Sequence, residues 1–207
     1  MFISLEGGEG SGKSTQAKLL AEKLQQAGLV CQLTREPGGE IGAEEIRRLL
    51  VEGESGRWGV ISETLLFLAA RVQHVERKIQ PALQRGEWIV SDRFHDSTRV
   101  YQGVGKGLAD NYYAMLHNLT LGNFFPALTF VCDIPVEAGL KRAFARNNQE
   151  TRFENMDINF HQQVRQGFLD IAAAEPQRVV VLDAQQDIAT IHQQICAEIR
   201  RRYGVLI

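Results

Sequence analysis

Hydrophobic residues recur with two different spacings along this chain. Residues 2–5 form a short apolar run, and from residue 17 to residue 27 the apolar positions return every three or four residues. A strand followed by an amphipathic helix gives this pattern. Further apolar runs at residues 30–33, 88–90, 128–131 and 179–182 alternate with helical patterns, the last of which carries isoleucine at 188, 191, 195 and 199. The alternation predicts an α/β fold with a five-stranded parallel sheet covered by helices.

Length and composition fit one domain spanning residues 1–207. The chain has 207 residues, 44% of them hydrophobic, and no internal repeat or Pro/Ser-rich linker divides it. Its net charge of −2 gives no field that would steer it to nucleic acid or to an anionic membrane, so we expect a small-molecule partner. The longest apolar run, residues 65–70, is too short to span a membrane, and Glu6 interrupts the N-terminal run before a signal-peptide core forms. We expect a cytoplasmic protein.

The cysteines and histidines do not predict a metal centre. Cys31, Cys132 and Cys196 are far apart and odd in number, so we interpret them as packed thiols. The five histidines lack metal-ligand spacing, and of them only His95 is expected near a site.

A glycine-rich segment connects the first predicted strand to the first predicted helix. Gly7 and Gly12-Lys13-Ser14 have the spacing of a phosphate-binding loop, in which backbone N–H groups surround a phosphate, the lysine reaches the β- and γ-phosphates and the hydroxyl binds Mg²⁺. We therefore predict a nucleoside triphosphate site, with Ser14 as a metal ligand. Its residues are Gly7, Gly8, Gly10, Ser11, Gly12, Lys13, Ser14 and Thr15.

Charged residues follow the other predicted strands. Residues 35–39 read REPGG, residues 92–94 read DRF, and single aspartates stand at 133 and 183. Because the carboxyl ends of parallel strands meet at one edge of a sheet, these groups are expected to gather beside the glycine loop. Arginine suits a bidentate grip on phosphate, so the pattern favours a site for two phosphorylated molecules.

Several segments resemble the thymidylate kinase family. The segments are REPGG at residues 35–39, LLFLAARVQHV at 65–75 and SDRFHDSTRVYQG at 91–103, together with the glycine loop and the Asp-Ala pair at 183–184. The resemblance spans nearly the whole chain. It implies a three-layer P-loop fold of the nucleoside-monophosphate-kinase type and transfer of the γ-phosphoryl group of ATP to dTMP, giving dTDP and ADP. It also implies Mg²⁺ and a homodimer.

The resemblance also implies roles for individual residues. Phe67 would stack on thymine, Arg71 would contact the edge of the base, and Arg93 would hold the dTMP phosphate. Tyr101 would crowd the 2′ position of the sugar, and Glu9 would lie near the 3′-hydroxyl of the acceptor. The complete set of expected acceptor residues is Glu9, Glu36, Pro37, Phe67, Arg71, Arg93, Ser97, Tyr101 and Gln102. The adenine would lie near Arg142, Asp183, Ala184 and Gln185.

A basic segment at about residues 141–154 resembles a mobile lid. Arg146 and Arg152 would close over the transferred group, because the glycine loop has no catalytic arginine of its own. The predicted catalytic set is thus Glu9, Lys13, Arg93, Arg146 and Arg152. The chain departs from the family pattern at Glu40, Gly42, Val100 and Thr151. The first two departures leave open how the turn after the second strand packs.

Two other functions stay open at this point. Another nucleoside or nucleoside-monophosphate kinase would share the loop and the lid but not the thymine-reading segment. A GTP-dependent switch would need a guanine-reading Asn-Lys-x-Asp and an Asp-x-x-Gly segment, neither of which the sequence contains.

Overall fold

The computed structural model describes residues 1–54, 56–145 and 152–207. Their five strands form one parallel sheet, as the hydrophobic pattern predicts, and the strand order is β2-β3-β1-β4-β5. The strands are β1 (Phe2–Glu6), β2 (Cys31–Arg35), β3 (Trp88–Asp92), β4 (Leu128–Asp133) and β5 (Val179–Asp183). β1 lies between β3 and β4, with Ile3 opposite Val90 on one side and Leu128 on the other. The glycine loop therefore emerges from the middle of the sheet.

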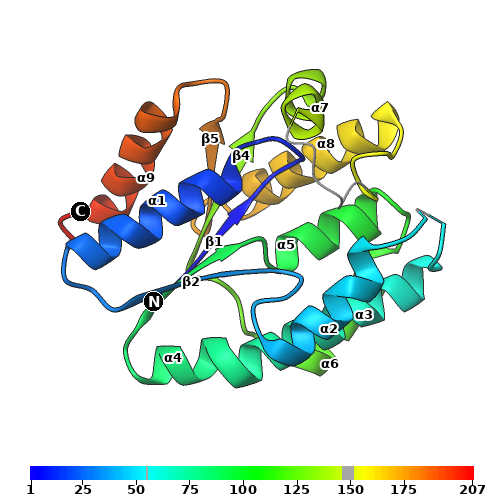
Figure 1. Cartoon of the computed structure of the whole chain (residues 1–207), viewed down its shortest axis with the longest axis horizontal. Coiled ribbons are helices and arrows are strands. Elements are labelled where there is room, and N and C mark those ends of the chain that lie inside the picture. Colours follow the sequence, from blue (N-terminus) through cyan, green and yellow to red (C-terminus); the bar gives the residue numbers. More distant parts are fainter. Residues whose placement is uncertain (55, 146–151) are drawn as a thin grey trace.

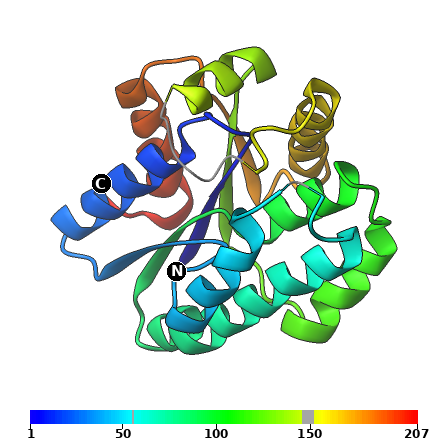
Figure 2. The ribbon, with the colours of Figure 1, turned by 45° about the vertical axis from the view of Figure 1, so that its right-hand side comes forward.

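Helices cover both faces of the sheet, which confirms the three-layer fold (Figure 1). The longer ones are α1 (Lys13–Gln26), α2 (Ile41–Val51), α3 (Val60–His74), α6 (Asp110–Leu121), α7 (Val136–Phe144), α8 (Ile158–Ala174) and α9 (Ile188–Tyr203). Shorter ones are η1 (Val75–Ile79), α4 (Gln80–Gln84), α5 (His95–Thr98) and η2 (Arg99–Val104), of which η1 and η2 are π-helical turns. α2, α3 and α6 lie side by side in both views (Figures 1 and 2).

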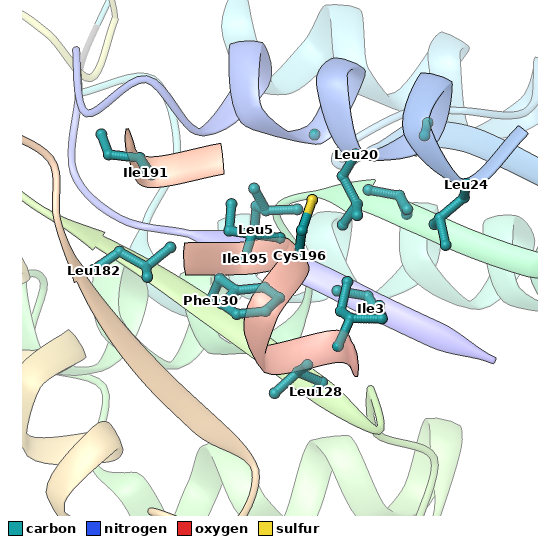
Figure 3. Close-up of a cluster of buried hydrophobic side chains, with 14 of the residues drawn as sticks. Ile3, Leu5, Leu20, Leu24, Leu128, Phe130, Leu182, Ile191, Ile195 and Cys196 are labelled. Carbon is teal, nitrogen blue, oxygen red and sulfur yellow. The ribbon is translucent and has the colours of Figure 1, made fainter. Parts of the chain in front are cut away.

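Alternation along β1 sends its side chains to two different cores. Ile3 and Leu5 pack with α1 and α9 in the larger cluster, which Figure 3 shows with Leu20 and Ile195. Phe2 points the other way and packs with Ile79 and Phe94. The three cysteines are buried free thiols, as expected. Among the described residues, no helix is long and apolar enough to cross a membrane.

Two glycines allow the loop after β1 to pack against its neighbours. Gly10 has φ of 68°, and a Cβ atom there would lie 1.9 Å from the carbonyl oxygen of Gly139 in α7. Gly7 has φ of 138°, and its Cβ would lie 2.5 Å from the carbonyl oxygen of Cys132. Only glycine fits both the left-handed backbone and the close approach. The phosphate loop is thereby fixed against β4 and α7.

The described departures from the family pattern have local explanations. Glu40 is the N-cap of α2, where its carboxylate accepts a hydrogen bond from the Gly42 N–H at 3.0 Å. Val100 is fully buried and packs with Tyr101 and Phe168. Thr151 lies outside the described residues.

Candidate active site

A cavity of about 210 Å³ opens at the carboxyl ends of β1, β2 and β3. It joins the glycine loop to the REPGG turn, to α3 and to the segment after β3. Its walls include Glu9, Lys13, Ser14, Glu36, Pro37, Phe67, Arg71, Asp92, Arg93, Ser97, Tyr101, Gln102 and Arg152. The structure thus brings together every residue predicted to bind the acceptor, although up to about 90 positions separate them in the sequence.

The phosphate loop presents one buried cation to this cavity. Lys13 begins α1 and is 6% exposed, and its Nζ donates to the Gly8 carbonyl at 3.0 Å. Burial and then the nearby Arg93 charge lower the pKa of Lys13. Ser14 and Thr15 follow in the exposed first turn of the helix. A lysine and free helix N–H groups at one point form a site for anionic phosphate.

Arg93 connects the glycine loop to the segment after β3. It has φ of 70°, which is rare for a residue other than glycine and occurs mainly where function requires it. Its guanidinium donates to the Gly7 carbonyl at 3.1 Å and to Ser97 Oγ at 3.0 Å. It also donates to Glu9 Oε1 at 2.9 Å and to the Tyr101 hydroxyl at 3.1 Å. The arginine is held on four sides before any ligand arrives.

Glu9 is held as a carboxylate. Burial alone would raise its pKa, but the charges of Arg93 and Lys13 and a hydrogen bond from the Tyr101 hydroxyl at 2.8 Å lower the pKa to about 2. The Tyr101 ring packs edge-on against Phe153, Phe160 and Phe168, with ring centroids 5.6, 5.9 and 6.3 Å away. The tyrosine therefore has little freedom to move.

Arg71 and Glu36 form a buried ion pair beneath the REPGG turn. Arg71 Nε lies 2.6 Å from Glu36 Oε2, and both side chains are at most 3% exposed. Arg71 Nη2 also donates to the Phe94 carbonyl and to Thr98 Oγ1, whereas its Nη1 has no partner among the described residues. Burial would raise the pKa of Glu36, but the Arg71 charge and a hydrogen bond from His74 lower it. The cavity wall thus contains one unused buried donor.

Three buried residues of this site were not found by sequence reasoning. Glu6 accepts hydrogen bonds from the Phe94 N–H at 2.7 Å and from Ser97 Oγ at 2.5 Å. His74 Nδ1 lies 3.0 Å from Glu36 Oε1. Glu63 accepts from Gln102 Nε2 at 2.8 Å. The available signal was a charged or polar residue within an otherwise buried strand or helix.

Burial, and then the Asp96 carboxylate, raise the pKa of Glu6 to about 8 against the lowering effect of its hydrogen bonds. Glu6 carries this perturbed carboxyl group directly beside the residues that hold Arg93. The group therefore changes its charge near neutral pH.

Asp133 lies beside the glycine loop as expected, in a second hollow lined also by Gly7, Gly8 and Glu9, and Asp183 is its neighbour on β5. Asp133 pairs with Arg165 at 2.7 Å and Asp183 accepts from the Gln185 N–H at 3.0 Å, and neither lines the cavity of about 210 Å³. The strand order is the reason, since β4 and β5 lie on the far side of β1 from β2 and β3. His95 also lies outside the cavity lining, with its ring 4.8 Å from Phe125, whereas His74 contacts the site.

The residues predicted for adenine do lie together. Arg142 extends from α7 and donates to the Ala184 carbonyl at 3.0 Å, beside Asp183 and Gln185. Arg146 lies outside the described residues. Arg152 is buried in the cavity wall and donates to the Leu50 carbonyl at 2.7 Å and to Glu63.

Comparisons with known proteins agree on one family. A family profile described as "Thymidylate kinase" matches residues 5–195. A thymidylate kinase of Dinoroseobacter shibae is 51% identical over 96% of this chain and 95% of that protein. One of Caulobacter vibrioides is 47% identical over 99% and 98%. The crystal structure of thymidylate kinase from Ehrlichia chaffeensis superposes with a TM-score of 0.78 at 33% identity, covering 96% of this chain and 98% of that one.

Proposed function

This chain belongs to the thymidylate kinase family, and on that premise we propose that it transfers the γ-phosphoryl group of ATP to dTMP, producing dTDP and ADP. The observation that carries the proposal is the single cavity that joins Lys13 of the phosphate loop to Arg93, Arg71 and Phe67. A donor site and an acceptor site that share one cavity let the two substrates meet in line. Catalysis then comes mainly from positioning and electrostatics.

In the acceptor half, Arg93 holds the dTMP phosphate and Phe67 stacks on thymine. Phe67 is half-buried on α3, and Phe153 lies across from it with the ring centroids 6.3 Å apart. Arg71 donates from Nη1, its one unpartnered nitrogen among the described residues, to a carbonyl oxygen of the base. Tyr101 packs against the 2′ carbon of the sugar, and Glu9 accepts a hydrogen bond from the 3′-hydroxyl.

In the donor half, Lys13 and the loop N–H groups bind the phosphates of ATP, and Arg142 packs on the adenine near residues 183–185. Mg²⁺ would be held by the Ser14 hydroxyl and by Asp92. Both line the cavity, and Asp92 Oδ1 is a buried oxygen with no partner among the described residues. Hydroxyl and carboxylate oxygens suit Mg²⁺. When bound, the ion neutralises charge on the transferring phosphates.

For the lid, we propose that Arg146 and Arg152 stabilise the charge of the transferred group. Arg152 shares the cavity with Lys13 and Arg93, which supports this role. Closure of the segment at about residues 141–154 would also exclude water and so limit ATP hydrolysis.

We also propose a homodimer formed through α3 and α6. Apolar side chains are exposed on these two packed helices, namely Ile61 and Leu65 on α3 and Tyr112, Met115 and Leu119 on α6. Several exposed apolar side chains on two packed helices are typical of an interface between proteins. A cytoplasmic location is supported by the three free thiols, which persist in a reducing compartment.

The test is a coupled ADP-release assay with dTMP, dUMP, UMP and dCMP as acceptors. We expect dTMP to be the best acceptor. The acceptor dUMP lacks the methyl group of thymine and should be used more weakly, because one methyl group contributes roughly 10- to 200-fold in kcat/KM. UMP should be weaker still. Phe67→Ala should raise KM for dTMP, while Phe125→Ala, a phenylalanine outside the cavity lining, serves as the matched control. Equal turnover of UMP and dTMP would instead indicate a uridylate-type kinase.

A further inference from the structure

Glu63 is a fully buried carboxylate that accepts hydrogen bonds from three side chains. It lies in α3 and is 0% exposed. Gln102 Nε2 donates to its Oε1 at 2.8 Å, and Lys106 Nζ lies 2.7 Å from Oε1 and 3.0 Å from Oε2. Arg152 Nη2 donates to Oε2. The two cations compensate the burial of the negative charge, while Gln102 is the neutral partner.

This carboxylate decides which way the Gln102 amide points. The two ends of a glutamine amide are nearly equal in size, so its direction is set by its hydrogen-bond partners. An ionised carboxylate only accepts hydrogen bonds, so the NH₂ group of Gln102 must face Glu63. The amide oxygen of Gln102 then points away from Glu63. Gln102 lines the cavity, and its Oε1 is buried with no partner among the described residues.

The residues that line the cavity therefore include an acceptor and a donor that no described residue uses. Gln102 Oε1 is an acceptor and Arg71 Nη1 is a donor, and both are buried without a partner among the described residues. Thymine and uracil carry an N3–H donor beside the O4 acceptor, which complements this pair. Cytosine carries an N3 acceptor beside an amino donor and would meet like groups at both positions. Buried polar groups that face like groups disfavour binding strongly.

We infer that Glu63 is a positioning residue that holds the Gln102 amide with its oxygen toward the cavity and thereby sets the discrimination between thymine and cytosine nucleotides. The inference rests on the proposed dTMP site. Glu63 is absent from the cavity lining and would reach the base only through Gln102. The same carboxylate binds Arg152, so the group that orients Gln102 also holds an arginine of the proposed lid segment.

The test is Glu63→Gln, which replaces the carboxylate by an amide of the same shape. An amide at 63 can accept from Gln102 or donate to it, so both directions of the Gln102 amide become available. We expect the ratio of kcat/KM for dTMP to that for dCMP to fall by about tenfold or more. The ratio for dTMP to dUMP should not change, because these two bases present the same hydrogen-bonding edge. A general loss of packing would not change the dTMP-to-dCMP ratio while leaving the dTMP-to-dUMP ratio unchanged.

Lys106→Met is the matched control. It removes a cation from Glu63 but leaves the bond from Gln102 intact, and Lys106 is not in the cavity lining. It should keep the dTMP-to-dCMP ratio of the unmodified protein. An unchanged ratio in Glu63→Gln, or an equal fall in both variants, would overturn the inference.

A second variant covers the case in which Glu63→Gln does not fold. Gln102→Met removes the amide itself and leaves Glu63 with Lys106 and Arg152, and it should show the same fall in the dTMP-to-dCMP ratio. A folded Gln102→Met protein that keeps the full ratio would contradict the role of this amide. Turnover of dTMP by the unmodified protein tests the proposed function separately, since the inference concerns only the change between variants.

Discussion

Replacing Arg71 by methionine should strongly destabilise the fold, because it leaves a buried carboxylate without its main partner. Arg71 Nε lies 2.6 Å from Glu36 Oε2. At that separation the Coulomb attraction is about 6 kcal/mol for an effective dielectric constant near 20. Much of this attraction only offsets the cost of taking two charges out of water, so the pair itself adds little. Removing one partner is different, because the desolvation cost of Glu36 remains.

We therefore expect Arg71→Met to lower the free energy of unfolding by about 3–5 kcal/mol. The Phe94 carbonyl and the Thr98 hydroxyl each lose a donor as well, and among the described residues His74 Nδ1, at 3.0 Å, is the side-chain partner that Glu36 keeps. Urea unfolding followed by circular dichroism measures the change. Adding Glu36→Gln should recover part of the loss, because the neutral amide no longer needs a counter-charge.

The pH dependence gives a second check on the same pair. Arg71 is the main group that lowers the pKa of Glu36 against the opposing effect of burial. A carboxyl group whose pKa is lowered on folding stabilises the folded state at pH values above its ordinary pKa. This stabilisation is lost as the pH falls through the pKa of the folded state. In Arg71→Met the pKa of Glu36 should rise. The difference in the free energy of unfolding between the variant and the unmodified protein should therefore become smaller as the pH falls from 7 to 5. If Arg71→Met lowered the free energy of unfolding by less than about 1 kcal/mol, and this effect were additive with that of Glu36→Gln, the account would be refuted.

Three further predictions concern the same cavity. Lys13→Ala should lower kcat by orders of magnitude in a folded protein, because the charge at the β- and γ-phosphates is lost; near-normal kcat in the ADP-release assay would remove Lys13 from that role. Tyr101→Phe should keep the acceptor order dTMP, dUMP, UMP. It should lower kcat, because Glu9 loses the hydrogen bond that the Tyr101 hydroxyl donates at 2.8 Å. Tyr101→Ala should instead relax the discrimination against UMP. Glu6→Gln should remove a pH dependence of stability: the raised pKa of about 8 favours the folded state at low pH, and this contribution is lost as pH rises from the ordinary 4.5 toward 8. Between pH 6 and pH 8 the variant should gain about 2 kcal/mol relative to the unmodified protein in urea unfolding, and parallel profiles would exclude Glu6 as the group.

The sequence alone determined the features that depend on residues close together in the chain. Each of the five strands appears as a short apolar run; β1, β3 and β4 are buried on both sides, because helices cover both faces of the sheet, while the edge strands β2 and β5 keep exposed positions. The phosphate loop is equally local, since Gly7, Gly10 and Gly12 supply the positive φ angles of one turn. The acceptor residues were predicted from segments that resemble a family. Their convergence on one cavity was predictable because parallel strands end at one edge.

Only the tertiary structure decided which charges meet. Four strand-end carboxylates look equivalent in the sequence, yet the order β2-β3-β1-β4-β5 brings Glu36 and Asp92 to the cavity and leaves Asp133 and Asp183 outside its lining. Glu63 and Gln102 lie 39 positions apart. No local pattern marks such a contact, because the cost of burying a charge depends on donors that only folding brings within hydrogen-bonding distance.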